Sequence, residues 1–295
     1  MVTDGSRTPT QHDFKGLLSM GQSALCFSGA ECARRDAQLL LCAASGYDRA
    51  MLLSRAREKP SQLIVDRFFS FISRRIKREP IQYIVGEWEF MGLPFIVNCD
   101  ALIPRPETER LVESVIGALG DCAAPLVLDM CTGSGCVAIS LATLLDNSTI
   151  IATDISASAL RLAEKNARLN NVSQSIIFIE GDMYHPVAAL SQNVVFDAIS
   201  ANPPYVTSGE LAMLPEDIRL YEPHVALDGG ADGLAFFHKI AEGAASRLKP
   251  SGFLAVETGA SQSQQVENIF MQHGFTKTWT ECDMSGHTRI VLASR

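Results

Sequence analysis

Hydrophobic side chains in this chain of 295 residues first recur with a helical period. Between residues 12 and 79 they return every three or four positions, which predicts helices with one apolar face. Ala33, Ala37, Leu40, Leu41 and Ala44 form one such face, and Ile64, Phe68, Phe71, Ile72 and Ile76 form another. We expect residues 1–79 to form a small helical N-terminal domain.

The pattern changes after Pro80, which ends the helical stretch. Residues 81–85 and 93–97 are short apolar runs, joined by a segment that begins at Gly86 and ends at Gly92. Short apolar runs bounded by glycines are typical of hairpins. We therefore predict that residues 80–100 form a β-hairpin linker between two domains.

From Pro125 onward, apolar runs of strand length alternate with helical segments, which predicts a doubly wound α/β domain over residues 101–295. The predicted strands are 126–130, 149–155, 175–179, 196–201, 253–257, 276–282 and 288–293, of which the last two form an antiparallel pair. The predicted helices of this alternation are 136–145, 157–170, 233–249 and 262–273.

Polar signals stand at the end of each of the first four predicted strands. They are the glycine turn after the first strand, then Asp154, Asp182 and Asn202. In an open α/β sheet, ligands bind beyond the carboxyl ends of the strands, near the point where strand order reverses. The coincidence of four signals at that edge predicts the ligand site.

The fourth strand stops at the tetrad Asn202-Pro203-Pro204-Tyr205. Two prolines keep the residues before them extended and donate no backbone hydrogen bond, so the tetrad is a rigid lip. It presents an amide oxygen, a free carbonyl and an aromatic ring, a set suited to a planar NH2 group. The tetrad also fits a plain turn that ends a strand.

The glycine turn leaves two cofactors open. Gly133 and Gly135 allow a sharp turn before a helix, and Asp154 follows at the spacing of a carboxylate that binds ribose hydroxyls. The same residues satisfy a dinucleotide pattern, so NAD is an alternative. Asp129, which suits a ligand with an ammonium group, and Asp182, which suits an adenine amino group, favour S-adenosylmethionine.

Charge and cysteine usage narrow the class of protein. The net charge is −8, and residues 101–295 carry 12 Lys and Arg against 22 Asp and Glu. Such an acidic half is a poor match for a nucleic-acid backbone. The eight cysteines lack zinc spacing, and no apolar stretch reaches the roughly 18 residues that span a bilayer. We expect a soluble cytoplasmic protein with reduced thiols, no metal and no membrane role.

The motifs together resemble the bacterial peptide chain release factor N(5)-glutamine methyltransferases. The resemblance runs from about Arg78 to the C-terminus and is carried by 103–109, 129–135, Asp154, 181–182, 202–205, 221–223 and 227–233. It implies a helical N-terminal domain, a hairpin linker and a class I, Rossmann-like, seven-stranded methyltransferase domain. It also implies a substrate, the glutamine of the Gly-Gly-Gln motif in class I release factors. We expect the helical domain to bind the partner, although its helices also fit a plain packing role.

The resemblance also implies roles for single residues. The expected cofactor-binding residues are Asp129, Cys131, Thr132, Gly133, Ser134, Gly135, Asp154, Asp182, Met183 and Asn202. The expected substrate-binding residues are Asn202, Pro203, Pro204, Tyr205, Arg105 and Glu107, of which Asn202, Pro203 and Tyr205 are also expected to be catalytic. Two positions depart from the family: Cys131 replaces a usual glycine, and Met183 stands where many members have tryptophan.

Three functions remain to be compared. The first is methyl transfer from S-adenosylmethionine to a release-factor glutamine by a monomer that does not bind nucleic acid directly. The Cys131 turn also resembles the enzymes that methylate a glutamine of a ribosomal protein. Because Asn-Pro-Pro-Tyr serves adenine chemistry too, a nucleic-acid amino-methyltransferase is the third, less favoured alternative. A noncatalytic cofactor-binding module is disfavoured by the intact motifs.

Overall fold

The computed structural model describes residues 12–190 and 194–295, in two compact units, Met1–Val85 and Gly86–Arg295. Residues 1–11 of the predicted N-terminal domain lie outside the described residues. Each unit has a hydrophobic core of its own.

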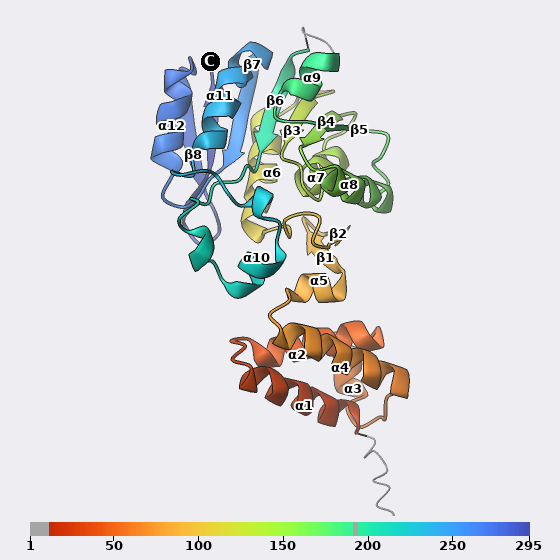
Figure 1. The fold of residues 1–295 in the computed structure, drawn as a ribbon. Helices are drawn as coiled ribbons and strands as arrows, with labels where there is room; N and C mark the ends of the chain where they lie inside the picture. Colours follow the sequence, from red (N-terminus) through yellow and green to blue (C-terminus); the bar gives the residue numbers. More distant parts are fainter. Residues whose placement is uncertain (1–11, 191–193) are drawn as a thin grey trace, which may run out of the picture. The chain divides into compact units, whose positions relative to one another are not determined.

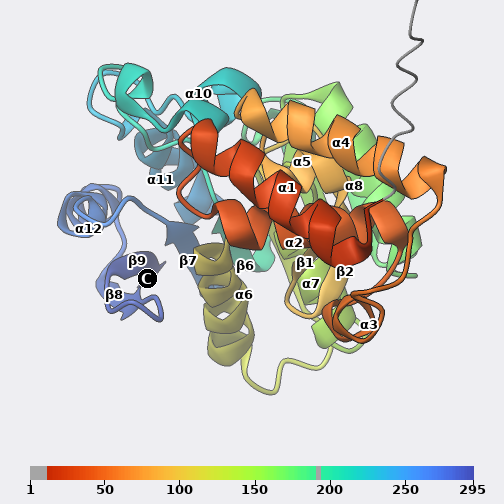
Figure 2. The ribbon, with the colours of Figure 1, turned by 90° about the horizontal axis from the view of Figure 1, so that it is seen from below.

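The first unit is a bundle of helices, as the helical period predicted. It contains α1 (Phe14–Phe27), α2 (Ala33–Ser45), α3 (Arg49–Ser54), α4 (Gln62–Ile76) and α5 (Ile81–Val85). Helices α1, α2 and α4 pack against one another, as Figure 2 shows. Leu17, Leu40 and Phe68 are fully enclosed between them. The start of α1 is capped by a carboxylate: Asp13 accepts from the amide of Gly16 at 2.7 Å.

The prediction of a strand at residues 81–85 is wrong. Ile81–Val85 is the short helix α5, and the hairpin consists of β1 (Glu87–Phe90) and β2 (Leu93–Ile96). Ile81 and Ile84 lie one helical turn apart and join the core of the first unit. A five-residue apolar run has no periodicity that separates helix from strand, so packing decided the outcome.

The hairpin belongs to the second unit instead of forming a separate linker. Asn166 of α8 (Ala157–Leu169) bonds both backbone groups of Ile96: its Oδ1 accepts from the amide at 2.7 Å, and its Nδ2 donates to the carbonyl at 3.1 Å. Asn166 itself is fully buried. The boundary of the compact units consequently falls between Val85 and Gly86 and divides the predicted linker 80–100.

The second unit contains a seven-stranded sheet, drawn in Figure 1. Its strands are β3 (Leu126–Met130), β4 (Thr149–Asp154), β5 (Ile176–Glu180), β6 (Phe196–Ala201), β7 (Leu248–Glu257), β8 (Lys277–Cys282) and β9 (Thr288–Ser294). The order is β5-β4-β3-β6-β7-β9-β8, parallel except for β9, which is antiparallel to both its neighbours. This confirms the predicted class I methyltransferase architecture.

Helices cover the sheet of the second unit. Helices α6 (Pro106–Leu119), α7 (Cys136–Leu144) and α8 contact the sheet, and α7 also contacts both α6 and α8. Helices α11 (Ala235–Arg247) and α12 (Ser263–Gln272) contact each other, β7, β8 and β9. The shorter helices are α9 (His185–Leu190) and α10 (Glu216–Tyr221), with 3-10 turns at Leu211–Met213 and His224–Ala226. Strands enclosed in this way carry continuous apolar runs, which is why the sequence signal was strong.

The strand order reverses between β3 and β6, and the location of this reversal in the sheet determines where a ligand can bind. Successive strands β3, β4 and β5 extend the sheet one way, while β6 and β7 extend it the other way. Strands β3 and β6 are neighbours, with Met130 opposite Ala201 in the register. The glycine turn after β3 therefore lies beside Asn202 after β6, at the crevice where open α/β sheets bind ligands.

A glycine in the first unit offers a test of its packing. A methyl group added at Gly21 would lie 2.5 Å from Cζ of the buried Phe68. Replacing a helical glycine by alanine ordinarily stabilises by about 1 kcal/mol, but overpacking a core costs about 1 to 3 kcal/mol. We expect Gly21→Ala to destabilise the first unit, measured as faster native-state hydrogen exchange in α1.

Gly117 provides the matched control for that variant. It lies in helix α6, and a methyl group added there would meet no atom within 4 Å. Gly117→Ala should leave exchange in α6 unchanged or slower. If Gly21→Ala also slows exchange, the described packing of α1 against Phe68 is incorrect.

Candidate functional site

A pocket opens at the carboxyl ends of β3, β4, β5 and β6 in the second unit. Most residues predicted for the site line it: Arg105, Asp129, Cys131, Thr132, Gly133, Ser134, Asp154, Asp182, Met183, Asn202 and Pro204. Four predicted residues do not line it: Glu107, Gly135, Pro203 and Tyr205. The residues that sequence reasoning missed include Thr108, Phe236 and Lys239. Thr108 lies in α6, and Phe236 and Lys239 lie in α11 (Ala235–Arg247). These helices reach the pocket only through tertiary packing, which no local sequence pattern indicates.

Asp129 is a buried carboxylate at the end of β3. Its Oδ2 accepts from the Thr132 hydroxyl at 2.7 Å and its Oδ1 from the Ser200 hydroxyl at 2.8 Å. Burial raises the pKa of Asp129 to about 6, and the two hydroxyls act in the opposite direction. A cation in the pocket would favour the charged form further, so Asp129 suits an ammonium group.

The glycine turn after β3 is built around Asp154. The Oδ2 of Asp154 accepts from the amide of Gly133 at 2.8 Å, while its Oδ1 accepts from Ser156 at 2.9 Å. Burial raises its pKa. A carboxylate has about four acceptor positions, so two amides leave Asp154 able to accept from the hydroxyls of a ribose.

Two residues of the turn have conformational reasons for their identity. Gly135 caps α7 with φ +81°, and a methyl group there would lie 3.0 Å from Cβ of Ala163 in α8. Its role is thus close packing behind the pocket wall instead of contact with a ligand. Cys131 has φ +56°, a region that favours glycine, which explains the usual glycine of the family at this position.

The far end of the pocket combines charge with apolar surface. Asp182, after β5, lies 3.6 Å from Nζ of Lys239 on α11, and both side chains are about half exposed. Met183 packs against the core of the second unit, and Ile155 and Phe236 add apolar lining. Such a mixture fits an adenine ring with a polar edge.

The wall formed by residues 101–105 is held by Glu222. This carboxylate pairs with Arg105 at 2.5 Å and accepts from the amide of Ile103 at 3.2 Å. Glu222 is 3% exposed, and burial raises its pKa while Arg105 lowers it. Arg105 is therefore paired instead of being free for a ligand. Glu107 lies beyond it in the first turn of α6 and does not reach the pocket lining.

Asn202 is at the wall of the pocket with its amide orientation fixed. Its Nδ2 donates to Oγ1 of Thr108 at 3.1 Å, and both residues line the pocket. Because Nδ2 uses one of its two N–H groups for Thr108, the plane of the amide is oriented and Oδ1 can accept from a ligand. The proline pair that follows keeps the backbone from rearranging.

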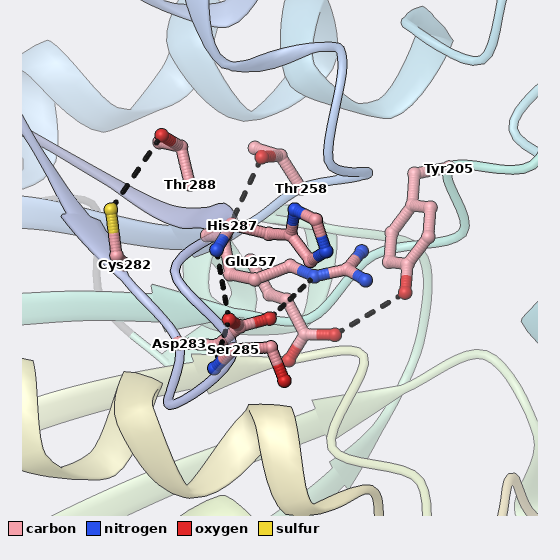
Figure 3. Close-up of polar contacts among 9 residues, drawn as sticks. Tyr205, Glu257, Thr258, Cys282, Asp283, Ser285, His287 and Thr288 are labelled. Carbon is pink, nitrogen blue, oxygen red and sulfur yellow. Dashed lines mark hydrogen bonds and ion pairs between the residues drawn. The ribbon is translucent and has the colours of Figure 1, made fainter.

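Tyr205 lies differently from the prediction. The tyrosine ring packs against the core of the second unit, and its hydroxyl donates to Oε1 of Glu257 at 3.3 Å (Figure 3). Burial raises the pKa of Tyr205, so the phenol is neutral. The ring is therefore a fixed support of the Asn-Pro-Pro-Tyr turn outside the pocket lining, and the sequence had no signal for its partner Glu257.

The donor set fits S-adenosylmethionine better than a pyrophosphate. Four carboxylates line the pocket, on Asp100, Asp129, Asp154 and Asp182, whereas its lysine and arginine, Lys239 and Arg105, are each paired with a carboxylate. A pyrophosphate would be repelled by these acids, and a sulfonium with an ammonium group would be attracted. The charges of the pocket therefore favour S-adenosylmethionine over NAD.

Known proteins similar to this chain are consistent with that chemistry. Residues 16–86 match the PrmC N-terminal domain, and residues 111–215 match the Methyltransferase small domain. The release factor glutamine methyltransferase of Moorella thermoacetica is 39% identical over 92% of this chain and 94% of its own length. That of Geobacter sulfurreducens is 38% identical over 93% and 94%. The chain belongs to the release factor glutamine methyltransferase family.

Solved structures support the fold of this family member. The human methyltransferase 10 domain containing protein matches with a TM-score of 0.51 at 18% identity, over 69% of this chain and 88% of that chain. At this identity the likeness shows the fold alone. In the part of the chain that the structure describes, no helix is long and apolar enough to cross a membrane.

The carboxylate Asp129 gives the family member a pH dependence that can be measured. Its pKa of about 6 means that it loses its charge between pH 7 and pH 5. If it binds an ammonium group, the Kd of S-adenosylmethionine should rise about tenfold from pH 8 to pH 5, one unit below that pKa. Isothermal titration calorimetry at both pH values measures this change.

Asp129→Asn separates this group from Asp154, whose pKa is also raised. The variant should bind more weakly at pH 8 and show a smaller pH dependence than the wild type. A wild-type Kd that stays constant between pH 8 and pH 5 would contradict the role of Asp129.

Proposed function

We propose that this protein transfers a methyl group from S-adenosylmethionine to the side-chain amide nitrogen of the glutamine in the Gly-Gly-Gln motif of class I release factors. The observation that carries the proposal is the fixed amide of Asn202 at the pocket wall, with Nδ2 bonded to Thr108. Two curated relatives at 38–39% identity have the same activity in their names.

The residues of the pocket divide between the two substrates. Asp129 and Asp154 would hold the ammonium group and the ribose of the cofactor, and Asp182 and Met183 its adenine, with Thr132, Gly133 and Ser134 forming the turn between them. When bound, this cofactor supplies an electrophilic methyl group on a sulfonium. Asn202 and Pro203 would hold the target amide, and Pro204 would support them.

Orientation is the main contribution that these residues make. An amide nitrogen is a poor nucleophile because its lone pair is delocalised, and two acceptors that take both N–H groups can fix the direction of that lone pair. Oδ1 of Asn202 would be one of those acceptors. The other would be the carbonyl of Pro203, whose two neighbours in the chain, Asn202 and Pro204, line the pocket although Pro203 itself does not. Holding reactants at near-attack distance lowers a barrier by about 7 to 11 kcal/mol. The proton that becomes acidic after transfer leaves through these acceptors or water.

Asn202→Ala should lower kcat by about 100-fold or more, since orientation is lost, and should change the Kd of the cofactor by no more than about threefold. The assay measures labelled methyl transfer to purified release factor, with mass spectrometry to identify the methylated residue. Asn170→Ala is the matched control, because Nδ2 of Asn170 bonds the carbonyls of Pro94 and Asn166 outside the pocket.

The same assay separates the substrate classes. Ribosomal protein and nucleic acid are offered in parallel with release factor. Label in the glutamine of the release factor is the expected result. Label that appears only in ribosomal protein or nucleic acid overturns the proposal, and so does an Asn202→Ala variant with wild-type turnover.

We also infer that the first unit contributes to recognition of the protein substrate. Its match to the PrmC N-terminal domain supports this, and the pocket is lined only by residues of the second unit among the described residues. A chain of residues 86–295 should bind the cofactor as the full chain does, with a KM for release factor raised about tenfold or more. An unchanged KM would show that the first unit has no role in recognition.

A further inference from the structure

The Asn-Pro-Pro-Tyr turn is held from behind by the segment that connects β7 to α12. Gln262, the N-cap residue of α12, donates from Nε2 to the carbonyl of Tyr205 at 2.9 Å. Its Oε1 accepts from the amide of Gly259 at 3.0 Å, which fixes the orientation of this amide. Gln262 is 8% exposed and does not line the pocket. It contacts the turn on the side away from the ligand.

Two glycines allow this close approach. A methyl group at Gly233 would lie 2.4 Å from the carbonyl oxygen of Tyr205, and one at Gly229 would lie 2.8 Å from the carbonyl oxygen of Pro204. The backbone of residues 229–233 therefore packs directly on the turn. The amide of Gly229 also donates to the carbonyl of Val206 at 2.8 Å. Residues 229–233 therefore limit movement of the Asn-Pro-Pro-Tyr turn on this side.

Glu257 contributes the carboxyl group of this support. It ends β7 with 1% of its surface exposed, and its Oε1 accepts from the hydroxyl of Tyr205 at 3.3 Å (Figure 3). Oε2 has no hydrogen-bonding partner among the described residues. Burial raises the pKa of Glu257 to about 7, and the hydroxyls of Thr108 and Tyr205 are the first groups that act against this rise.

Both of those hydroxyls belong to, or bond with, residues of the Asn-Pro-Pro-Tyr turn. Tyr205 is the last residue of the tetrad, and Thr108 accepts the amide hydrogen bond of Asn202, its first residue. The carboxyl group of Glu257 therefore bonds the last residue of the tetrad. An uncharged apolar side chain would fill the same space without the cost of a buried carboxyl, but it would not accept from the hydroxyl of Tyr205.

We propose that Glu257 is a positioning residue for methyl transfer: it holds the hydroxyl of Tyr205, and so fixes the turn that sets the direction in which Oδ1 of Asn202 faces the target amide. This inference rests on the proposed function of Asn202. Glu257 lies outside the pocket lining, and the cofactor side of the pocket is built from the ends of β3, β4 and β5. Its loss should therefore affect turnover without affecting cofactor binding.

Glu257→Ala removes the acceptor and tests the proposal in the full-length protein. We expect kcat for release factor to fall about 100-fold, with the KM and the Kd of S-adenosylhomocysteine within about threefold of the wild type. Glu257→Gln keeps an oxygen that can accept from Tyr205, so it should restore kcat to within about tenfold. A Glu257→Ala variant with wild-type kcat, or one whose kcat and cofactor affinity fall together, overturns the proposal.

Glu267→Gln is the matched control. Glu267 lies in α12 and accepts from the hydroxyl of Thr278 at 2.9 Å, so the variant makes the same carboxylate-to-amide change away from the turn. Its kcat should equal that of the wild type. A wild type that fails to methylate release factor refutes the proposed function, whereas an active wild type with an equally active Glu257→Ala variant refutes only the role of Glu257.

A double-mutant cycle keeps the test decisive if Glu257→Ala does not fold. Tyr205→Phe removes the same hydrogen bond from its other end. Combined with Glu257→Met, which fills a similar space but has no acceptor oxygen, it should lower kcat by much less than the product of the two single effects, since both variants remove one contact. Independent effects that multiply would show that Glu257 does not act through Tyr205 and would overturn the proposal.

Discussion

The constraint on which the site depends is the immobility of one side-chain amide. Asn202 follows a buried strand and precedes two prolines, so its backbone has almost no freedom, and Thr108 takes up its nitrogen. An asparagine on a flexible loop would sample many orientations, and only a small fraction would present an acceptor to a bound amide. The surrounding structure, from α6 in front to the β7–α12 connection behind, restricts that sampling.

Electrostatics determines what else can occupy the crevice. The carboxylate of Asp129 is buried and that of Asp154 is partly buried. Burial raises the pKa of each, so both carry a cost that a cationic ligand offsets. The positively charged side chains near the pocket are already paired, Arg105 with Glu222 and Lys239 with Asp182. These charges favour a sulfonium over a pyrophosphate, although ligands of both kinds bind at a glycine turn at this position of an α/β sheet.

The sequence predicted the strands and most of the site because its signals there are local. Strands such as β3 and β6 are enclosed on both faces and appear as continuous apolar runs, and their ends are marked by glycine, aspartate or asparagine. Where an apolar run was too short to show a period, tertiary packing determined the secondary structure. Residues Ile81–Val85 are helical because Ile81 and Ile84 pack into the core of the helical bundle. Tyr205 turned toward Glu257, a residue 52 positions later, and no local pattern links the two. Lys239 was missed for the same reason.

In the proposed reaction, Oδ1 of Asn202 accepts from the amide of the target glutamine while the cofactor lies over the ends of β3 and β4. A crystal structure with S-adenosylhomocysteine and a release factor measures this directly. We expect the glutamine nitrogen to lie within about 3.2 Å of Oδ1 of Asn202 and to face the sulfur. A structure in which the Asn202 side chain points away from that nitrogen, or in which another residue holds the amide, would contradict this role of Asn202.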